Sequence, residues 1–208
     1  MSAPRVGVLA LQGAFREHLE TLGRLGVDAF PLRTEAELDE AEAVVLPGGE
    51  STTMDKLLRK FNLQQPLRQR LAEGMPALAT CAGLILLARD VADGLPDQES
   101  LDILPIAVRR NGYGRQPDSF EASVDVEGLD ATFPAVFIRA PVIDSVDQAV
   151  EVLARHDGRA VAIRSDNVLG LTFHPELSRD DRLHRLFLDI VEAAAMRPRM
   201  VTRRAAGA

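Results

Sequence analysis

The sequence predicts an α/β fold, with a mixed, mostly parallel sheet covered by helices on both faces. In the first half, short apolar runs of the buried-strand type alternate with amphipathic segments, which is typical of a parallel sheet. In the second half, alternating apolar and polar residues and tight turns indicate antiparallel or edge strands.

The first half contains four strand candidates separated by helical patterns. The strands are expected at residues 5–11, 27–32, 43–47 and 75–80. Between them, helices are expected at residues 14–26, 54–61 and 65–74. Pro66 suits the start of the last helix and Gly74 its end. After residue 80 a short apolar helix begins at once.

The second half predicts a less regular arrangement. Residues 120–126 alternate apolar and polar side chains, and residues 159–173 hold two apolar runs separated by a turn at 165–167. A last helix at 179–195 has an apolar stripe, and we expect Ser178 to cap it. We therefore expect one domain over residues 1–196, followed by an Arg-containing, solvated tail at 197–208.

Composition excludes several classes of function. The chain has 208 residues, a formal net charge of −7 and an isoelectric point near 5.2, so nothing attracts it generally to nucleic acid or to anionic membranes. The first apolar run is too short for a signal peptide or a membrane span. We expect a cytoplasmic protein that binds neither nucleic acid nor membrane. One cysteine forms no internal disulfide and no multi-thiolate zinc site, and we expect no metal.

That cysteine, Cys81, lies at the switch from the strand at 75–80 to a helix. A nucleophile on such a turn is exposed, and the next backbone N–H groups face the oxyanion that forms. Ala79, Ala82 and Gly83 are small enough for a tight turn, and the helix start favours the thiolate. Taken alone, a buried structural cysteine remains the stronger alternative.

A nucleophile needs a base, and His174 is the best candidate among the histidines. It ends an apolar strand, Pro175 stops that strand, and Glu176 follows at a spacing that allows its carboxylate to orient the ring. His18 and His184 lie within amphipathic helices, and His156 lies in an expected turn. We expect each of these three to be a surface or partly packed residue.

The segment "LPGGESTT" places glycines after another strand. It is no phosphate-binding P-loop, because Glu50 follows Gly49 where such a loop has lysine. Its backbone N–H groups suit an oxyanion or an amino-acid ligand, and Glu50 would be free to accept from an ammonium group. A tight turn with a helix cap from Ser51 or Thr52 is the alternative, and both interpretations are compatible.

Taken together, these segments resemble the class I glutamine amidotransferases, and more narrowly the glutaminase subunits of pyridoxal 5'-phosphate synthase. The resemblance covers most of the chain, and its motifs are "GVLALQGAFREH", "LPGGESTTM", "TCAGLILLA", "RRNGYGRQPDSFEA", "VFIRAP" and "FHPEL". It implies a flavodoxin-like three-layer sandwich that hydrolyses L-glutamine to L-glutamate and ammonia. Ala79 departs from the family, which usually has glycine there.

The resemblance also assigns roles to residues. Cys81 would be the nucleophile, His174 its general base and acid, and Glu176 the residue that orients His174. Backbone N–H groups of Gly49 and Ala82 would form the oxyanion hole. The residues expected to bind L-glutamine are Gly49, Glu50, Ser51, Arg110, Ile138 and Arg139.

Finally, the resemblance implies a partner. A separate, barrel-type synthase subunit would receive the ammonia within a large hetero-oligomer and make pyridoxal 5'-phosphate from pentose and triose phosphates. This chain would bind no cofactor, because pyridoxal 5'-phosphate is the product of the complex. We expect "LALQGAFREH" to form part of the contact. Two alternatives stay open: a Cys-His hydrolase or peptidase that acts alone, and a non-catalytic binding domain on the same fold.

Overall fold

A computed structural model of the chain describes residues 3–95, 97–110 and 119–197. Its main sheet has seven strands. Strands β12, β4, β3, β1 and β2 run parallel to one another, whereas β11 pairs antiparallel with both β10 and β12. In spatial order they are β10 (Glu151–His156), β11 (Arg159–Ser165), β12 (Val168–Leu171), β4 (Ala77–Thr80), β3 (Ala43–Leu46), β1 (Arg5–Leu9) and β2 (Asp28–Leu32). The predicted mixed, mostly parallel sheet is confirmed.

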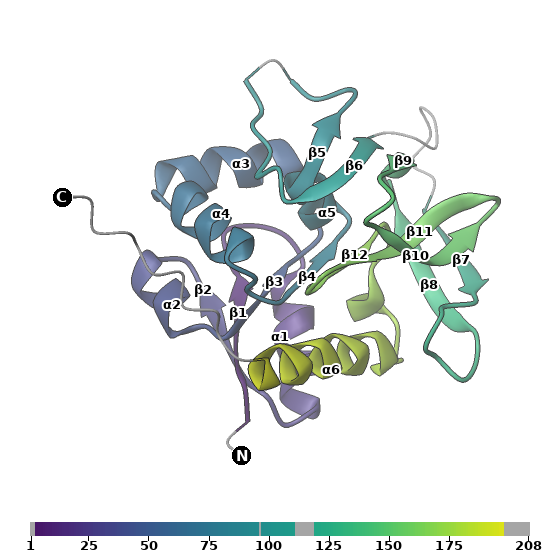
Figure 1. Ribbon diagram of the computed structural model, residues 1–208, viewed down its shortest axis with the longest axis horizontal. Helices are drawn as coiled ribbons and strands as arrows, with labels where there is room; N and C mark the ends of the chain where they lie inside the picture. Colours follow the sequence, from purple (N-terminus) through teal and green to yellow (C-terminus); the bar gives the residue numbers. More distant parts are fainter. Residues whose placement is uncertain (1–2, 96, 111–118, 198–208) are drawn as a thin grey trace.

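Helices cover both faces of this sheet (Figure 1). Apolar side chains on one face pack against α2 (Glu35–Glu40), α3 (Ser51–Lys60), α4 (Gln64–Ala72) and α5 (Ala82–Leu87). Those on the other pack against α1 (Phe15–Arg24), α6 (Arg182–Met196) and a hairpin of β7 (Ser119–Val124) and β8 (Phe133–Ile138). Alternate residues of β3 enter the two cores, which makes this strand apolar throughout.

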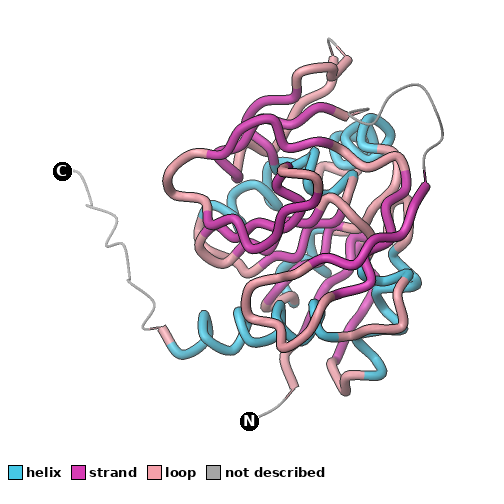
Figure 2. Tube along the Cα trace, turned by 90° about the vertical axis from the view of Figure 1, so that its right-hand side faces the viewer, coloured by secondary structure: helices cyan, strands magenta, loops and turns pink. Residues whose placement is uncertain are grey.

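Further strands lie beside the main sheet. One small sheet consists of β5 (Ala88–Val91), β6 (Leu104–Arg109) and β9 (Val142–Val146), and the β7–β8 hairpin forms another. The side of the molecule that carries β7 and β8 is built mostly of strands (Figure 2). Residues 120–124 of the alternating segment lie in β7, an antiparallel strand, and the two runs at 159–173 pair antiparallel as β11 and β12, as predicted.

Two helix caps differ from the prediction. The N-cap of α3 is Glu50, whose carboxylate accepts hydrogen bonds from the backbone N–H groups of Thr52 and Thr53, so neither Ser51 nor Thr52 is the cap. Ser178 does not cap α6, because a 3-10 helix η1 (Pro175–Leu177) intervenes and Ser178 ends that turn. The N-cap position of α6 belongs to Asp181.

The C-terminal helix α6 ends at Met196. Of the tail expected at 197–208, residues 198–208 lie outside the part of the chain that the structure describes. Among the described residues, no helix combines the length and the apolar composition needed to cross a membrane.

The topology concentrates loops at one edge of the main sheet. Strands β12, β4, β3 and β1 are adjacent and parallel, so their carboxyl ends meet there. Ligands in open parallel sheets bind at this edge, where turns lead into helices. The segments that leave these four strands are the ones that the sequence motifs singled out.

Candidate active site

Cys81 sits on a strained turn between β4 and α5. Its backbone has φ 47° and ψ −102°, a combination that L-residues rarely adopt, and its N–H donates to the Leu171 carbonyl at 2.9 Å. Gly83 allows α5 to approach β3 closely, because a Cβ there would collide with the Leu46 carbonyl. The thiol lies 3.9 Å from the Ile138 carbonyl oxygen. Such backbone strain is typical of a turn that presents a reactive side chain.

His174 and Glu176 form the buried pair that the sequence predicted. His174 Nδ1 lies 2.7 Å from Glu176 Oε1, and both residues are 6% exposed. Burial opposes protonation of the ring, but hydrogen bonds to Cys81 and Glu176 raise the pKa of His174 to about 10. Gly48 makes room for this arrangement, since a Cβ there would collide with the His174 ring. Hydrogen bonds thus link the Cys81 thiol, the His174 imidazole and the Glu176 carboxylate in that order.

These groups open into a cavity of about 290 Å³, a size that suits a small ligand. The cavity gathers residues that follow strands of all three sheets. Of the residues predicted from the sequence, its lining includes Gly49, Glu50, Ser51, Cys81, Arg110, Ile138, Arg139 and His174. Glu176 lies behind His174, and Ala82 follows Cys81 at the start of α5.

The carboxylate of Glu50 is not free, contrary to the expectation from its sequence position. It accepts hydrogen bonds from the backbone N–H groups of Thr52 and Thr53, from the Thr53 hydroxyl and from Arg110 Nη2. Burial opposes its ionisation, but the bonds from Thr53 and Thr52 lower the pKa of Glu50 to about 2. With these donors the carboxylate oxygens are saturated, so its side chain has little capacity left for a substrate ammonium group.

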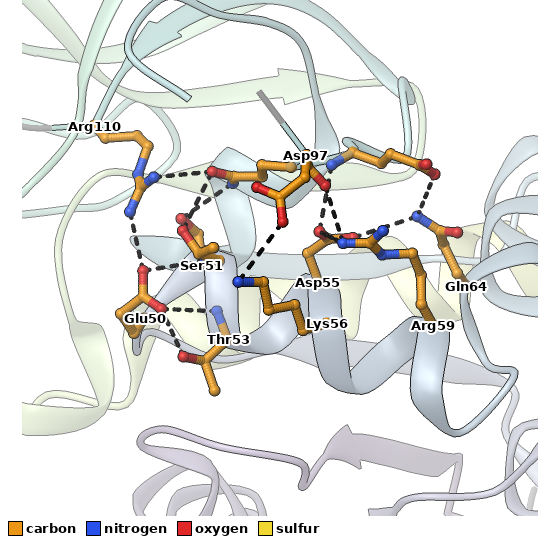
Figure 3. Close-up of polar contacts among 12 residues, drawn as sticks. Glu50, Ser51, Thr53, Asp55, Lys56, Arg59, Gln64, Asp97 and Arg110 are labelled. Carbon is orange, nitrogen blue, oxygen red and sulfur yellow. Dashed lines mark hydrogen bonds and ion pairs between the residues drawn. The ribbon is translucent and has the colours of Figure 1, made fainter. Parts of the chain in front are cut away.

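Gln98 is a residue near the cavity that the sequence motifs did not indicate. Its Oε1 accepts from Arg110 Nη1 at 2.9 Å, and its Nε2 donates to Ser51 Oγ at 3.3 Å. Figure 3 shows Arg110 and Glu50 at the same end of this network, with the Arg110 guanidinium directed toward the Glu50 carboxylate. Gln98 lies in a loop with no helical or strand pattern, so only the fold brings it to Arg110 and Ser51.

Gln12 also turns toward the loop of Gly48, Gly49 and Glu50. Its Oε1 accepts the Glu50 backbone N–H at 2.8 Å, and it lines the cavity beside Gly49. The side chain that we expected to belong to a partner contact therefore has an internal hydrogen bond.

His18 and His184 are fully buried, so the expectation that they lie at the surface or are only partly packed is wrong. His18 Nδ1 lies 2.9 Å from His184 Nε2, and His18 Nε2 lies 3.3 Å from Glu176 Oε2. A signal was present in the sequence: Phe15, His18 and Leu22 share the three- and four-residue spacing of the buried stripe of α1.

No group of three or more His, Cys, Asp or Glu side chains is arranged to hold a metal ion among the described residues. The chemistry that the cavity can perform with its own side chains is nucleophilic attack by a thiol paired with a carboxylate-oriented imidazole.

Comparison with known proteins agrees with this geometry. The model of the SNO glutamine amidotransferase family matches residues 8–193. The chain belongs to this family. Among curated relatives of this glutamine amidotransferase, the pyridoxal 5'-phosphate synthase subunit PdxT of Nocardioides sp. is 55% identical over 195 residues, covering 91% of this chain and 97% of the relative. The PdxT of Acidothermus cellulolyticus is 56% identical over 198 residues, covering 92% of this chain and 96% of the relative.

Solved structures agree as well. A crystal structure of a glutamine amidotransferase is 48% identical, with a TM-score of 0.85, and the match covers 90% of this chain and 98% of that one. A glutamine amidotransferase from Thermotoga maritima is 17% identical with a TM-score of 0.60, and the match covers 96% of this chain and 88% of that one. This second likeness supports the fold alone. The fold of this family member is the flavodoxin-like three-layer sandwich that the resemblance implied.

Proposed function

We propose that this chain is the glutaminase subunit of a pyridoxal 5'-phosphate synthase. It hydrolyses L-glutamine to L-glutamate and ammonia, and it passes the ammonia to a separate synthase subunit. The observation that carries the proposal is Cys81 on its strained turn, connected through His174 to Glu176 at the edge of a cavity. The membership in a glutamine amidotransferase family supports it.

The glutamine enters the cavity with its side-chain amide toward Cys81. Arg110 is the candidate for the substrate carboxylate, because a guanidinium binds carboxylates in a planar, two-pronged geometry. Gly49, Ser51, Ile138 and Arg139 line the same cavity and complete the substrate site in this proposal. Glu50 acts by holding Arg110 at 2.9 Å and by capping α3, rather than by binding the ammonium group with a free carboxylate.

The reaction then has two halves. The Cys81 thiolate attacks the side-chain amide carbon, and backbone N–H groups of Gly49 and Ala82 stabilise the oxyanion. His174 gives its proton to the departing ammonia, which leaves a glutamyl thioester on Cys81. His174 next takes a proton from water, which attacks the thioester and releases L-glutamate. Glu176 keeps the His174 ring aligned through both halves.

The ammonia is useful to a synthase only before it is protonated and lost to solvent. We therefore propose that the chain works bound to a barrel-type synthase subunit, in a large hetero-oligomer, and that the site uses no cofactor of its own. Pyridoxal 5'-phosphate is then the product of the partner. We place the reaction in the cytoplasm, where a single catalytic thiol stays reduced.

A glutaminase assay with and without the synthase subunit tests this proposal. We expect ammonia release that requires Cys81 and increases with the partner. Cys81→Ala should abolish release while the variant still folds and binds the synthase subunit. Equal hydrolysis of γ-glutamyl substrates without a partner would favour an independent hydrolase, and absence of turnover in both conditions would favour a binding domain.

A further inference from the structure

The triad carboxylate continues into a second buried polar chain that the reaction scheme does not use. Glu176 Oε1 faces His174 Nδ1 at 2.7 Å, while Glu176 Oε2 lies 3.3 Å from His18 Nε2. His18 also contacts Thr80 Oγ1 at 3.3 Å and His184 at 2.9 Å. The two histidines come from α1 and α6, which are distant in sequence and share one face of the sheet. Nothing in the amidotransferase mechanism above requires them.

In the part of the chain that the structure describes, Glu176 Oε2 lacks a well-placed hydrogen-bond donor. It is buried, and within the described residues it has no hydrogen bond that meets normal geometry. A buried carboxylate oxygen without a hydrogen bond destabilises the fold, so a donor placed beside it is strongly favoured. His18 Nε2, shared between this oxygen and the Thr80 hydroxyl, is such a donor.

The protonation of the two rings follows from their surroundings. Burial lowers the pKa of His18, and burial together with repulsion from a protonated His18 lowers the pKa of His184 to about 3, so both rings are neutral at pH 7. A neutral ring carries one N–H, and a lone pair on Nε2, only 3.3 Å from Glu176 Oε2, would be repelled by the carboxylate. The proton of His18 is therefore on Nε2.

This assignment also explains His184. Because His18 Nδ1 then accepts, His184 Nε2 must donate to it across 2.9 Å. His184 Nδ1 is left as a bare lone pair, and this nitrogen is the one that has no hydrogen-bond partner among the described residues. An unprotonated nitrogen leaves no N–H unsatisfied, so the orphan atom fits the same tautomer.

We propose that His18 is a positioning residue of the catalytic triad. Its Nε2–H holds the outer oxygen of Glu176, so that the inner oxygen stays aligned with His174 while that ring gains and loses its proton. His184 keeps the His18 proton on Nε2. This inference rests on the proposed glutaminase function, and it resembles the way outer partners orient ligand carboxylates and imidazoles at metal sites.

Kinetics of the complex with the synthase subunit test the role. We expect His18→Leu to lower kcat about 10- to 100-fold, with KM for glutamine changed less than about twofold. His18→Gln carries an amide N–H in place of Nε2–H and should recover most of kcat. A merely structural role would give equal losses in both variants, or a loss of partner binding, and either result would overturn the proposal.

The tautomer gives a test that needs no variant and no turnover. Nitrogen-15 NMR of the wild-type chain should show His18 protonated on Nε2 with a bare Nδ1. A proton on Nδ1, or a charged ring at pH 7, would overturn the inference even if the glutaminase is active. If the wild-type complex releases no ammonia, the proposed function fails, and the tautomer then decides separately whether His18 serves Glu176.

Discussion

At the scale of single residues, His174 lies between two groups that both favour its protonated form. Glu176 holds Nδ1, and Cys81 is hydrogen bonded to the ring from the other side. Burial opposes the charge but loses to these partners, and the pKa of His174 rises to about 10. We therefore expect an imidazolium beside the sulfur at neutral pH, which in the proposed reaction protonates the ammonia that leaves.

Titration of His174 by NMR checks this state. In the wild-type chain we expect the ring to stay protonated at pH 8 and to titrate near pH 10. Cys81→Ala removes one of the partners that raise the pKa, so the midpoint should move to lower pH, and Glu176→Gln should lower it as well. A wild-type midpoint near the ordinary value of about 6.5 would contradict the assignment.

Glu50 predicts a pH-dependent contribution to stability. Its folded pKa of about 2 lies below the ordinary value of 4.5, so its charge stabilises the fold above about pH 4.5 and that gain disappears as pH falls through 2. We expect Glu50→Gln to reduce the free energy of unfolding by about 1 kcal/mol at pH 7, as for loss of a cap, and by progressively less toward pH 2. Urea unfolding at several pH values measures this.

The matched control is Glu20→Gln, at an exposed position of α1. It should change the free energy of unfolding by less than about 0.5 kcal/mol. If the loss in Glu50→Gln stays constant from pH 7 to pH 2, the cap and its contact with Arg110 do not depend on the charge.

At the scale of secondary-structure elements, the position of Cys81 depends on how closely α5 packs on β3. Gly83 in the first turn of α5 lies against the backbone of Leu46, where no side chain fits. Ala79 on β4 is buried in the same core, directly across from Gly170 of β12. The methyl group of Ala79 therefore lies where the neighbouring strand has no side chain, and the turn forms with alanine at this position.

Gly83→Ala tests this packing. The added methyl group must push α5 away from β3 and move Cys81, so we expect the free energy of unfolding to fall by about 1 to 3 kcal/mol and glutaminase activity to be lost. Gly23→Ala in α1 is the control, because nothing lies within 4 Å of its Cβ position. It should be neutral or stabilise by up to about 1 kcal/mol, since alanine is the better helix former. Equal effects of the two changes would contradict the packing argument.

At the scale of the whole molecule, the sequence predicted every strand of the main sheet except β10, together with the strand β7 and the candidate catalytic residues, but not the sheet of β5, β6 and β9. Buried parallel strands such as β3 are continuous apolar runs, and Cys81 and His174 follow such runs at recognisable turns. The pairing of β6 with β9 joins Ile106 to Val146 across a long stretch of sequence, and no local pattern encodes it. The contact of Gln98 with Arg110 has the same origin.

Two strands that the sequence did not predict, β6 and β8, complete the candidate cavity. Cys81 and Gly49 follow strands of the main sheet, Arg110 follows β6, and Ile138 ends β8. A ligand in this cavity therefore contacts segments that follow all three sheets. Because binding to the folded state alone raises its stability, glutamine should stabilise the whole chain rather than one loop.

Thermal or urea unfolding of Cys81→Ala, which binds without turnover, measures this effect. With glutamine at about 100 times its Kd, we expect the free energy of unfolding to rise by about 2.7 kcal/mol. Arg110→Met in the same background should remove most of the increase, because Arg110 lines the cavity. Arg109→Met should keep it, because Arg109 is exposed and pairs with Asp144 at 3.0 Å outside the cavity. An undiminished increase with Arg110→Met would exclude Arg110 as the carboxylate ligand.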